Sequence, residues 1–397
     1  MRRNCLKVFT VWGTLAAGLV WAQNSLPEFL ELKSVEEVRL TVDPKDWSTL
    51  QANYLENTYY PATFTWRGQS WAQVGIRSRG RGTRTPLKPA LRVDFSRFVS
   101  SQRFQGMKNL AFENLEQDPP MVREFLSMAL FRKAGVAAPR EVFIHLFVNG
   151  QDMGLHLAME YYDKSFLKRA LGEDGGDLYE YSWIDYWNWW PRGGEDLNYA
   201  PEPFELKTNE KTAPVSALRE MVEALAASDA QSFDASLGER IDIDSLIRYL
   251  AVETFIADTD GLRGDVGANN FYIYRRDRDK RFEILSWDKD ATFYDYERDL
   301  WKGIPESELL RKMLDVPEHR KRYLQVLREL IRSVGPESGW LEQLAAETFA
   351  KIRPYAENDP VKRYSRVEFE ESVANLQHFL RERPRLLLEM LVAEGQE

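Results

Sequence analysis

The hydrophobic periodicity of the chain changes near residue 160, and this change constrains the fold more than any other feature. Between residues 36 and 95, apolar and polar residues alternate in short runs, which is the period of strands in an antiparallel sheet. After about residue 163 the pattern becomes mostly helical. We therefore predict an α+β fold of two lobes: a sheet-rich first lobe over residues 23–162 and a helix-rich second lobe over residues 163–397.

Individual elements follow from local signals. The predicted strands of the first lobe are 38–42, 62–66, 72–76, 90–95, 142–148 and 154–159, and its predicted helices are 46–54 and 119–134. Asn149-Gly150 is a strong hairpin-turn signal, and Asp118, Pro119 and Gly135 mark the ends of the second helix. In the second lobe the pattern predicts helices at 213–227, 244–257 and beyond 306, with a hairpin of strands 271–274 and 282–285.

Residues 1–22 have the pattern of a secretory signal peptide. Arg2, Arg3 and Lys7 precede a short apolar run, and a small-residue cleavage signal precedes Gln23. Neither this run nor any later one is long enough for a good membrane span. We expect export to a secreted, periplasmic or cell-surface location. Cleavage would remove Cys5, the only cysteine, so no disulfide is expected.

The charge of the chain argues against general nucleic-acid binding. The formal net charge is −9, and loss of the three cations of the signal peptide would make it −12. A polyanion would be repelled by such a protein. A basic or serine-rich protein partner would be tolerated.

An aromatic-rich segment, expected as an insertion at about residues 179–204, interrupts the second lobe. It contains Tyr179, Tyr181, Trp183, Tyr186, Trp187, Trp189 and Trp190. Such side chains either stack on sugars or anchor partners, or they pack against their own domain.

The polar residues with the clearest chemistry surround the predicted hairpin 271–285. Asp260 and Asn270 precede it, and Asp288 and Asp290 follow it. Phosphoryl transfer needs a carboxylate that accepts the proton of the acceptor hydroxyl. It also needs oxygen ligands that hold magnesium. Loop Asp and Asn residues also commonly make turns, so this pattern alone leaves both interpretations open.

The first lobe offers candidate phosphate-binding groups. Arg79 and Gly80 lie in a Gly- and Arg-rich loop whose backbone amides and guanidinium groups suit phosphates. Lys88 and Arg92 follow near the next strand, and Glu124 lies early in the predicted helix, where it would pair with Lys88. An exposed hairpin loop and ordinary surface lysines explain the same residues.

The order of these segments resembles the spore-coat protein H family of atypical kinases along nearly the whole mature chain. The matching pieces include Arg79-Gly80, Lys88-Pro89, Arg123-Glu124, Val148-Asn149-Gly150, Glu205-Leu206-Lys207, Asp260-Gly261, Asn270–Tyr274 and Trp287-Asp288-Lys289-Asp290. Three departures stand out: Asp258 occupies a position where relatives often have Asn, the segment from Asp260 to Asn270 is longer than in many relatives, and Tyr294 stands where many have Gly.

The resemblance implies a kinase-like fold that binds ATP and Mg²⁺ (or Mn²⁺) between its lobes and phosphorylates protein serine or threonine. By this resemblance Lys88, with Arg79, Gly80 and Arg92, would handle the nucleotide, and Glu124 would anchor the lysine. Glu160 would lie near the hinge that receives adenine.

The same resemblance makes Asp260 the catalytic base, with Asp265 as the alternative because its spacing to Asn270 fits a kinase catalytic loop. Asn270 and Asp288 would hold the metal, with Asp290 as an accessory acid. Two other functions remain open, a non-enzymatic surface or coat protein and phosphate transfer to a glycan.

Overall fold

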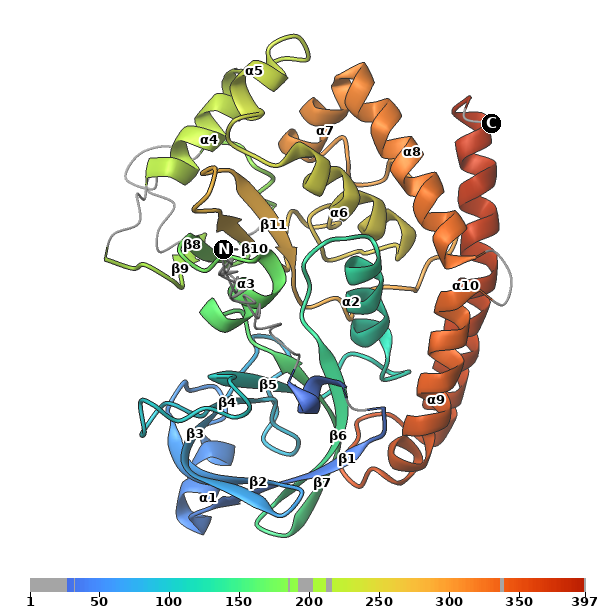
Figure 1. The fold of residues 1–397 in the computed structure, drawn as a ribbon. Helices are drawn as coiled ribbons and strands as arrows, with labels where there is room; N and C mark the ends of the chain where they lie inside the picture. Colours follow the sequence, from blue (N-terminus) through green and yellow to red (C-terminus); the bar gives the residue numbers. More distant parts are fainter. Residues whose placement is uncertain are drawn as a thin grey trace, which may run out of the picture.

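The computed structural model describes residues 27–31, 33–184, 186–191, 203–211, 216–335 and 339–395. The predicted signal peptide lies outside these ranges, as do residue 185 and residues 192–202 of the aromatic segment. The described part folds into a β-barrel and a larger, mostly helical body that lies against it (Figure 1). The predicted two-lobed α+β fold is therefore confirmed, whereas the exact lobe boundaries stay predictions.

The first lobe is a barrel that closes in the order β1-β2-β3-β4-β5-β7-β6. Its strands are β1 (Glu36–Val42), β2 (Tyr60–Trp66), β3 (Gln69–Ser78), β4 (Leu91–Asp94), β5 (Asn109–Glu113), β6 (Glu141–Val148) and β7 (Gln151–Glu160). The 3-10 helix η1 (Glu28–Glu31) and helix α1 (Pro44–Ala52) accompany them. Neighbouring strands are antiparallel except β1 and β6, which pair in parallel from Glu36 opposite Ile144 to Leu40 opposite Val148. Because alternate residues face inward, the apolar positions of the alternating runs form one core, with Phe64 at its centre among several rings.

The local signals for the first lobe are accurate. All six predicted strands and the short first helix are present. Asn149 and Gly150 both have positive φ, 52° and 81°, as a two-residue hairpin turn requires. Strand β5 was not predicted, because four of its five residues are buried and no alternation is visible.

The second lobe combines helices with a small sheet of order β11-β10-β8-β9. Its strands are β8 (Asp177–Tyr181), β9 (Phe204–Leu206), β10 (Phe271–Arg275) and β11 (Phe282–Ser286). Its helices are α3 (Lys164–Leu171), α4 (Ser216–Ala227), α5 (Phe233–Leu237), α6 (Ile243–Phe255), α7 (Glu308–Asp315), α8 (Pro317–Val334), α9 (Trp340–Asn358) and α10 (Arg366–Ala393). None of the described helices is long and apolar enough to cross a membrane.

The aromatic segment is part of this sheet at both ends. Its start lies in β8 and its end is the first residue of β9, and Tyr179 pairs with Leu206. Trp187 and Trp189 are buried in the second-lobe core. By contrast, Tyr186 and Trp190 are 61% and 43% exposed. Most of the described aromatic side chains therefore stabilise their own lobe.

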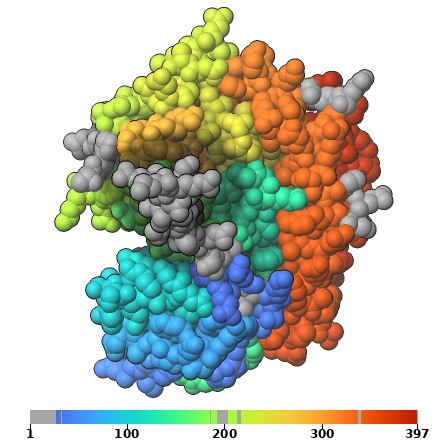
Figure 2. Space-filling view, in the orientation of Figure 1, coloured from blue at the N-terminus to red at the C-terminus, as the bar shows by residue number. Residues whose placement is uncertain are grey.

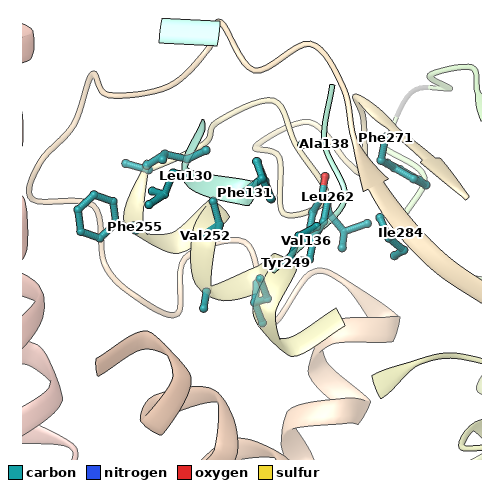
Figure 3. Close-up of a cluster of buried hydrophobic side chains, with 14 of the residues drawn as sticks. Leu130, Phe131, Val136, Ala138, Tyr249, Val252, Phe255, Leu262, Phe271 and Ile284 are labelled. Atoms are coloured by element: carbon teal, nitrogen blue, oxygen red, sulfur yellow. The ribbon is translucent and has the colours of Figure 1, made fainter. Parts of the chain in front are cut away.

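Helix α2 (Arg123–Lys133) belongs to the second lobe by its packing, although it precedes the predicted boundary. Its buried side chains share a core with α6, and the rings of Phe131 and Tyr249 lie 4.9 Å apart (Figure 3). The helix begins at Arg123, later than the predicted start, because residues 119–121 form a turn. The N-cap residue is Val122, whose side chain makes no capping hydrogen bond, so Asp118 is not the cap that was predicted. The Asp118 carboxylate nevertheless accepts the Arg123 amide at 2.8 Å, and Gly135 follows the helix end with φ 76°.

The C-terminal helices run beside both lobes (Figure 1). Helix α9 contacts β7 of the barrel, and α10 packs against α8 and α9. In the space-filling view, the early barrel residues and the C-terminal residues adjoin at the surface (Figure 2). The last part of the chain thus contributes to the position of the first lobe.

Candidate active site

The β10–β11 hairpin brings the two strongest candidate metal ligands together. Phe271 pairs with Ser286, and the Trp287 amide donates to the Asn270 carbonyl at 3.3 Å. Asn270 immediately precedes one strand and Asp288 follows the other by two residues, so both residues lie at the same end of the hairpin. The loop after α6 approaches this end through Asp260.

Asp260 is held by two amide side chains. Its two carboxylate oxygens accept hydrogen bonds from Asn269 and Asn270, at 3.0 and 2.9 Å. Burial raises the pKa of Asp260; the Asn269 hydrogen bond opposes this shift, and the charges of Asp258 and Asp288 add to it. A fixed carboxylate with a raised pKa suits a general base.

An acidic pocket lies where α2, the end of β5 and the segment after β11 meet. We define the acidic pocket by its carboxylates, Glu113, Glu116, Asp118, Glu124, Asp288 and Asp290. Its cavity of about 20 Å³ has room for a single water or ion. The pocket is thus too small for a nucleotide but suits a cation.

Carboxylates in the acidic pocket hold protons more tightly than usual. Burial, followed by the charges of Asp288, Asp118 and Asp260, raises the pKa of Asp290 well above its ordinary range. Burial also raises the pKa of Glu124 well above its ordinary range, with neighbouring carboxylates adding to the effect. Burial raises the pKa of Asp118 to about 6. A divalent cation would relieve this repulsion.

The backbone around the site is strained at several positions. Non-glycine residues with positive φ include Leu115, Met121, Ala257, Asn270, Asp288 and Phe293. Each such residue costs of the order of 1 kcal/mol and persists only where the surrounding structure enforces it. Two of them, Leu115 and Asp288, line the acidic pocket, so the surrounding structure holds the backbone of this pocket in an unfavourable conformation.

The residues present fit a magnesium or manganese ion by their chemistry. Among the described residues, no three acidic or histidine side chains are grouped closely enough to hold an ion as they stand. Nevertheless the pocket offers oxygen donors only, and the buried Oδ1 atom of Asp118 has no hydrogen-bond partner. Hard divalent cations prefer such oxygen ligands.

Arg79 is a first-lobe cation that contacts the acidic pocket. It forms an ion pair with Glu113 of the acidic pocket, and its guanidinium lies 5.3 Å from the ring centre of Trp287. Its charge also opposes the rise in the pKa of Asp288. Gly80, with φ 97°, is the second residue of the loop between β3 and β4, and its carbonyl accepts a hydrogen bond from Arg84.

Lys88 has a different partner from the one predicted. Its ammonium group bonds to Asp359, just after α9, at 2.7 Å, and the lysine is 1% exposed. Glu124 instead accepts the backbone amide of Lys289. The predicted Lys88–Glu124 pair is therefore wrong for this structure, because the lysine is bound by the carboxylate of Asp359, between α9 and α10.

Glu160 and Arg92 lie near the connection between the lobes. Glu160 ends β7, and its carboxylate is bound by Arg169 and by the Arg140 amide at 2.8 Å. Arg92 stacks on Tyr161 at 4.1 Å and bonds to Asn109. We call residues 160–163 the hinge.

A larger cavity of about 630 Å³ opens beside the hinge. It is lined by five cations, Arg103, Lys108, Lys164, Lys207 and Lys211, and by two acids, Asp163 and Glu210. Its volume is that of an ordinary ligand pocket, about 300–1,000 Å³. Its positive lining contrasts with the acidic chain and was not anticipated, because these residues are far apart in sequence.

Asp265, the alternative base, binds an arginine rather than the side chains that hold Asp260. Its carboxylate forms an ion pair with Arg298 at 2.7 Å. The geometry thus favours Asp260 over Asp265 as the proposed base.

Sequence reasoning missed the ionic contacts beneath the site. The ammonium group of Lys289 bonds to Asp258 at 2.8 Å and to Glu253 at 2.9 Å, all three buried. The sequence shows Lys289 between two acidic residues after an apolar strand, which could have indicated a buried ion pair. Its partners, however, can be identified only from the fold.

Fold and site together define a kinase-like protein of two lobes. The family model described as "CotH kinase protein" matches residues 76–387, and the chain belongs to this family.

Curated relatives agree with this assignment. Inner spore coat protein H of Bacillus subtilis (strain 168) is 23% identical over 374 residues, covering 89% of this chain and 96% of the relative. Invasin CotH7 of Rhizopus delemar is 24% identical over 241 residues, covering 56% of this chain and 39% of the relative.

Two solved structures share a more distant similarity. The Golgi casein kinase with Mn/ADP bound is 10% identical with a TM-score of 0.35, and the match covers 93% of this chain and 76% of that one. The Helicobacter pylori proinflammatory kinase CtkA is 8% identical with a TM-score of 0.30, covering 86% and 94%.

Proposed function

We propose that this chain is an exported kinase that transfers the γ-phosphate of ATP to serine or threonine hydroxyls of a protein, with Mg²⁺ or Mn²⁺ as cofactor. The observation that carries the proposal is the convergence of Asp260, Asn270 and Asp288 beside an ion-sized acidic pocket, in a member of the CotH kinase family. Phosphoryl transfer depends mainly on positioning and charge stabilisation, which such a site supplies.

Each candidate residue has a definite role in this proposal. Asp260 would accept the proton of the acceptor hydroxyl, because Asn269 and Asn270 hold its carboxylate in place. Asn270, Asp288 and Asp290 would hold the cation, which neutralises charge on the phosphates. Arg79 would bind phosphate oxygens after leaving Glu113.

The nucleotide would enter between the lobes near the hinge. There Arg92 lies on Tyr161, and the cavity with the positive lining adjoins Asp163 at the end of the hinge. The formal net charge of −9 is compatible with a basic acceptor, since an acidic protein attracts cationic side chains.

An assay of phosphate transfer from ATP also distinguishes the two other candidate functions from a protein kinase. A glycan acceptor or a purely binding role draws support from the exposed rings of Tyr186 and Trp190. A binding protein would not turn over ATP, and a glycan kinase would label a non-protein product.

The test is incubation of the purified protein with γ-labelled ATP and Mg²⁺ or Mn²⁺, with and without EDTA, and with a basic, serine-rich protein as acceptor. Label on protein that depends on the metal and disappears in Asp288→Asn would support the kinase. No label and no ATP binding under either metal would favour the binding protein.

A further inference from the structure

We propose that Lys289 is a positioning residue that joins the proposed base and the proposed metal ligands into one rigid unit. The inference rests on the proposed kinase function and adds a residue to it. Lys289 lies between Asp288 and Asp290, yet its side chain is 0% exposed. The lysine is therefore directed into the protein, while its two acidic neighbours line the acidic pocket.

The ammonium group of Lys289 fixes the loop that carries Asp260. It bonds to Asp258 at 2.8 Å and to Glu253 of α6 at 2.9 Å. Asp258 in turn accepts the backbone amide of Asp260 at 2.9 Å, and Glu253 accepts that of Leu262 at 2.8 Å. Both carboxylates that bind the lysine therefore also hold the backbone on either side of the proposed base.

The backbone of Lys289 fixes the metal-binding segment to α2. Its amide donates to the Glu124 carboxylate. Its carbonyl accepts from the hydroxyls of Thr292 at 2.8 Å and Ser127 at 3.3 Å. One residue thus connects α2, α6, the Asp260 loop and the segment after β11.

The loop that carries Asp260 is closely packed against the ion pairs of Lys289. A Cβ atom on Gly261 would lie 2.2 Å from both the Asp258 and the Glu253 carboxylate. Only glycine fits there, so the loop lies directly against the ion pair. A change in the length or charge of residue 289 would therefore be transmitted to Asp260 rather than absorbed.

The two carboxylates also explain why the residue is a lysine. Asp258 and Glu253 are 1% and 0% exposed, and side by side they would repel each other without a cation. Loss of Lys289 would leave two buried charges unpaired. Replacing Asp258 by Asn would remove one of them and keep an oxygen that accepts the Asp260 amide.

The experiment compares Lys289→Met with the double variant Lys289→Met/Asp258→Asn in the full chain. Three quantities are measured: the melting temperature without metal, the Mn²⁺ concentration that gives half-maximal binding of a fluorescent ADP analogue, and the rate of phosphate transfer. Lys280→Met is the matched control, because Lys280 forms an exposed pair with Asp277 in the β10–β11 turn.

We expect Lys289→Met to lower the melting temperature by about 5–10 °C. The double variant should recover at least half of that loss. The Mn²⁺ concentration for half-maximal binding should remain about tenfold or more above that of the wild type. The transfer rate should remain about 100-fold or more below it, because the ion pair between residue 289 and the Asp260 loop is missing. The Lys280 control should match the wild type in all three quantities.

Wild-type behaviour of Lys289→Met in all three quantities would overturn the proposal. So would a double variant in which Mn²⁺ dependence and the transfer rate recover together with the melting temperature. Failure of both variants to fold would also overturn it, because Lys289 would then be a determinant of the fold alone. If the wild-type protein neither binds the ADP analogue with Mn²⁺ nor transfers phosphate, the proposed function itself fails and this role with it.

Discussion

The ammonium group of Lys88 lies 2.7 Å from the carboxylate of Asp359, although 271 positions separate them in the sequence. Both side chains are buried, and Asp359 also accepts the Leu155 amide of β7 at 2.9 Å. The pair therefore joins the barrel to the end of α9. This contact gives Lys88 a structural role that the family resemblance did not imply.

Lys88→Met should destabilise the protein by about 3–5 kcal/mol, because it leaves Asp359 as an unpaired buried charge. The double variant Lys88→Met/Asp359→Asn should recover much of this loss. Chemical denaturation measures both. If Lys88→Met keeps its stability but loses ATP binding, Lys88 is a nucleotide ligand after all.

Arg79→Gln should weaken ATP binding by about tenfold or more, because the charge of Arg79 acts on Asp288 and its guanidinium would bind phosphate oxygens. A titration with a fluorescent ATP analogue, in the presence of Mg²⁺, measures the affinity. Arg39→Gln, at an exposed ion pair with Glu37 in β1, serves as the matched control and should bind ATP like the wild type. Unchanged affinity in Arg79→Gln would remove this residue from the proposed nucleotide site.

Asp288→Asn should lower phosphate transfer by at least about 100-fold and leave the protein folded. Without metal its melting temperature should equal or exceed that of the wild type, because the change removes a negative charge beside Asp290 and Glu124. Transfer of labelled phosphate and thermal melting give the two readouts. Normal transfer would contradict the assignment of Asp288.

Asp260→Ala and Asp265→Ala form a matched pair that decides which residue is the base. We expect Asp260→Ala to lose about 100-fold or more in transfer rate, since its carboxylate lies among the site residues. Asp265→Ala should keep most of the activity, because its carboxylate binds Arg298. The reverse ranking would transfer the role to Asp265.

The stability of the protein should fall in acid partly through His156. This buried side chain is surrounded by the barrel and lies near Lys88, and burial lowers its pKa to about 3, against about 6.5 in the unfolded chain. Between these values the unfolded state binds the extra proton, so His156 contributes stability above pH 6.5 that is lost as the pH falls toward 3. The loss attributable to it is at most about 4–5 kcal/mol.

Denaturation of His156→Gln between pH 7.5 and 4 checks this expectation. Its stability should depend less steeply on pH than that of the wild type, while the exposed His378→Gln should follow the wild type. Equal slopes for all three proteins would show that His156 is not the group that titrates.

The sequence predicted several elements whose structure depends on neighbouring residues. Alternation in 38–42 and 62–66 predicted strands, and Asn149-Gly150 predicted a hairpin, because side-chain period and turn geometry act over a few positions. The same locality placed Asn270 and Asp288 at one end of a hairpin, since two paired strands bring their flanking residues together. Buried strand β5 had no such periodic signal.

Contacts between distant segments were decided only by the tertiary structure. Closure of the barrel by β1 and β6, the packing of α2 on α6, the Lys88–Asp359 pair and the partners of Lys289 all join segments that local patterns treat separately. A lysine or carboxylate has the same local signature whether exposed or buried. Its partner is selected when the core forms, because a buried charge must then meet an opposite charge or a hydrogen bond.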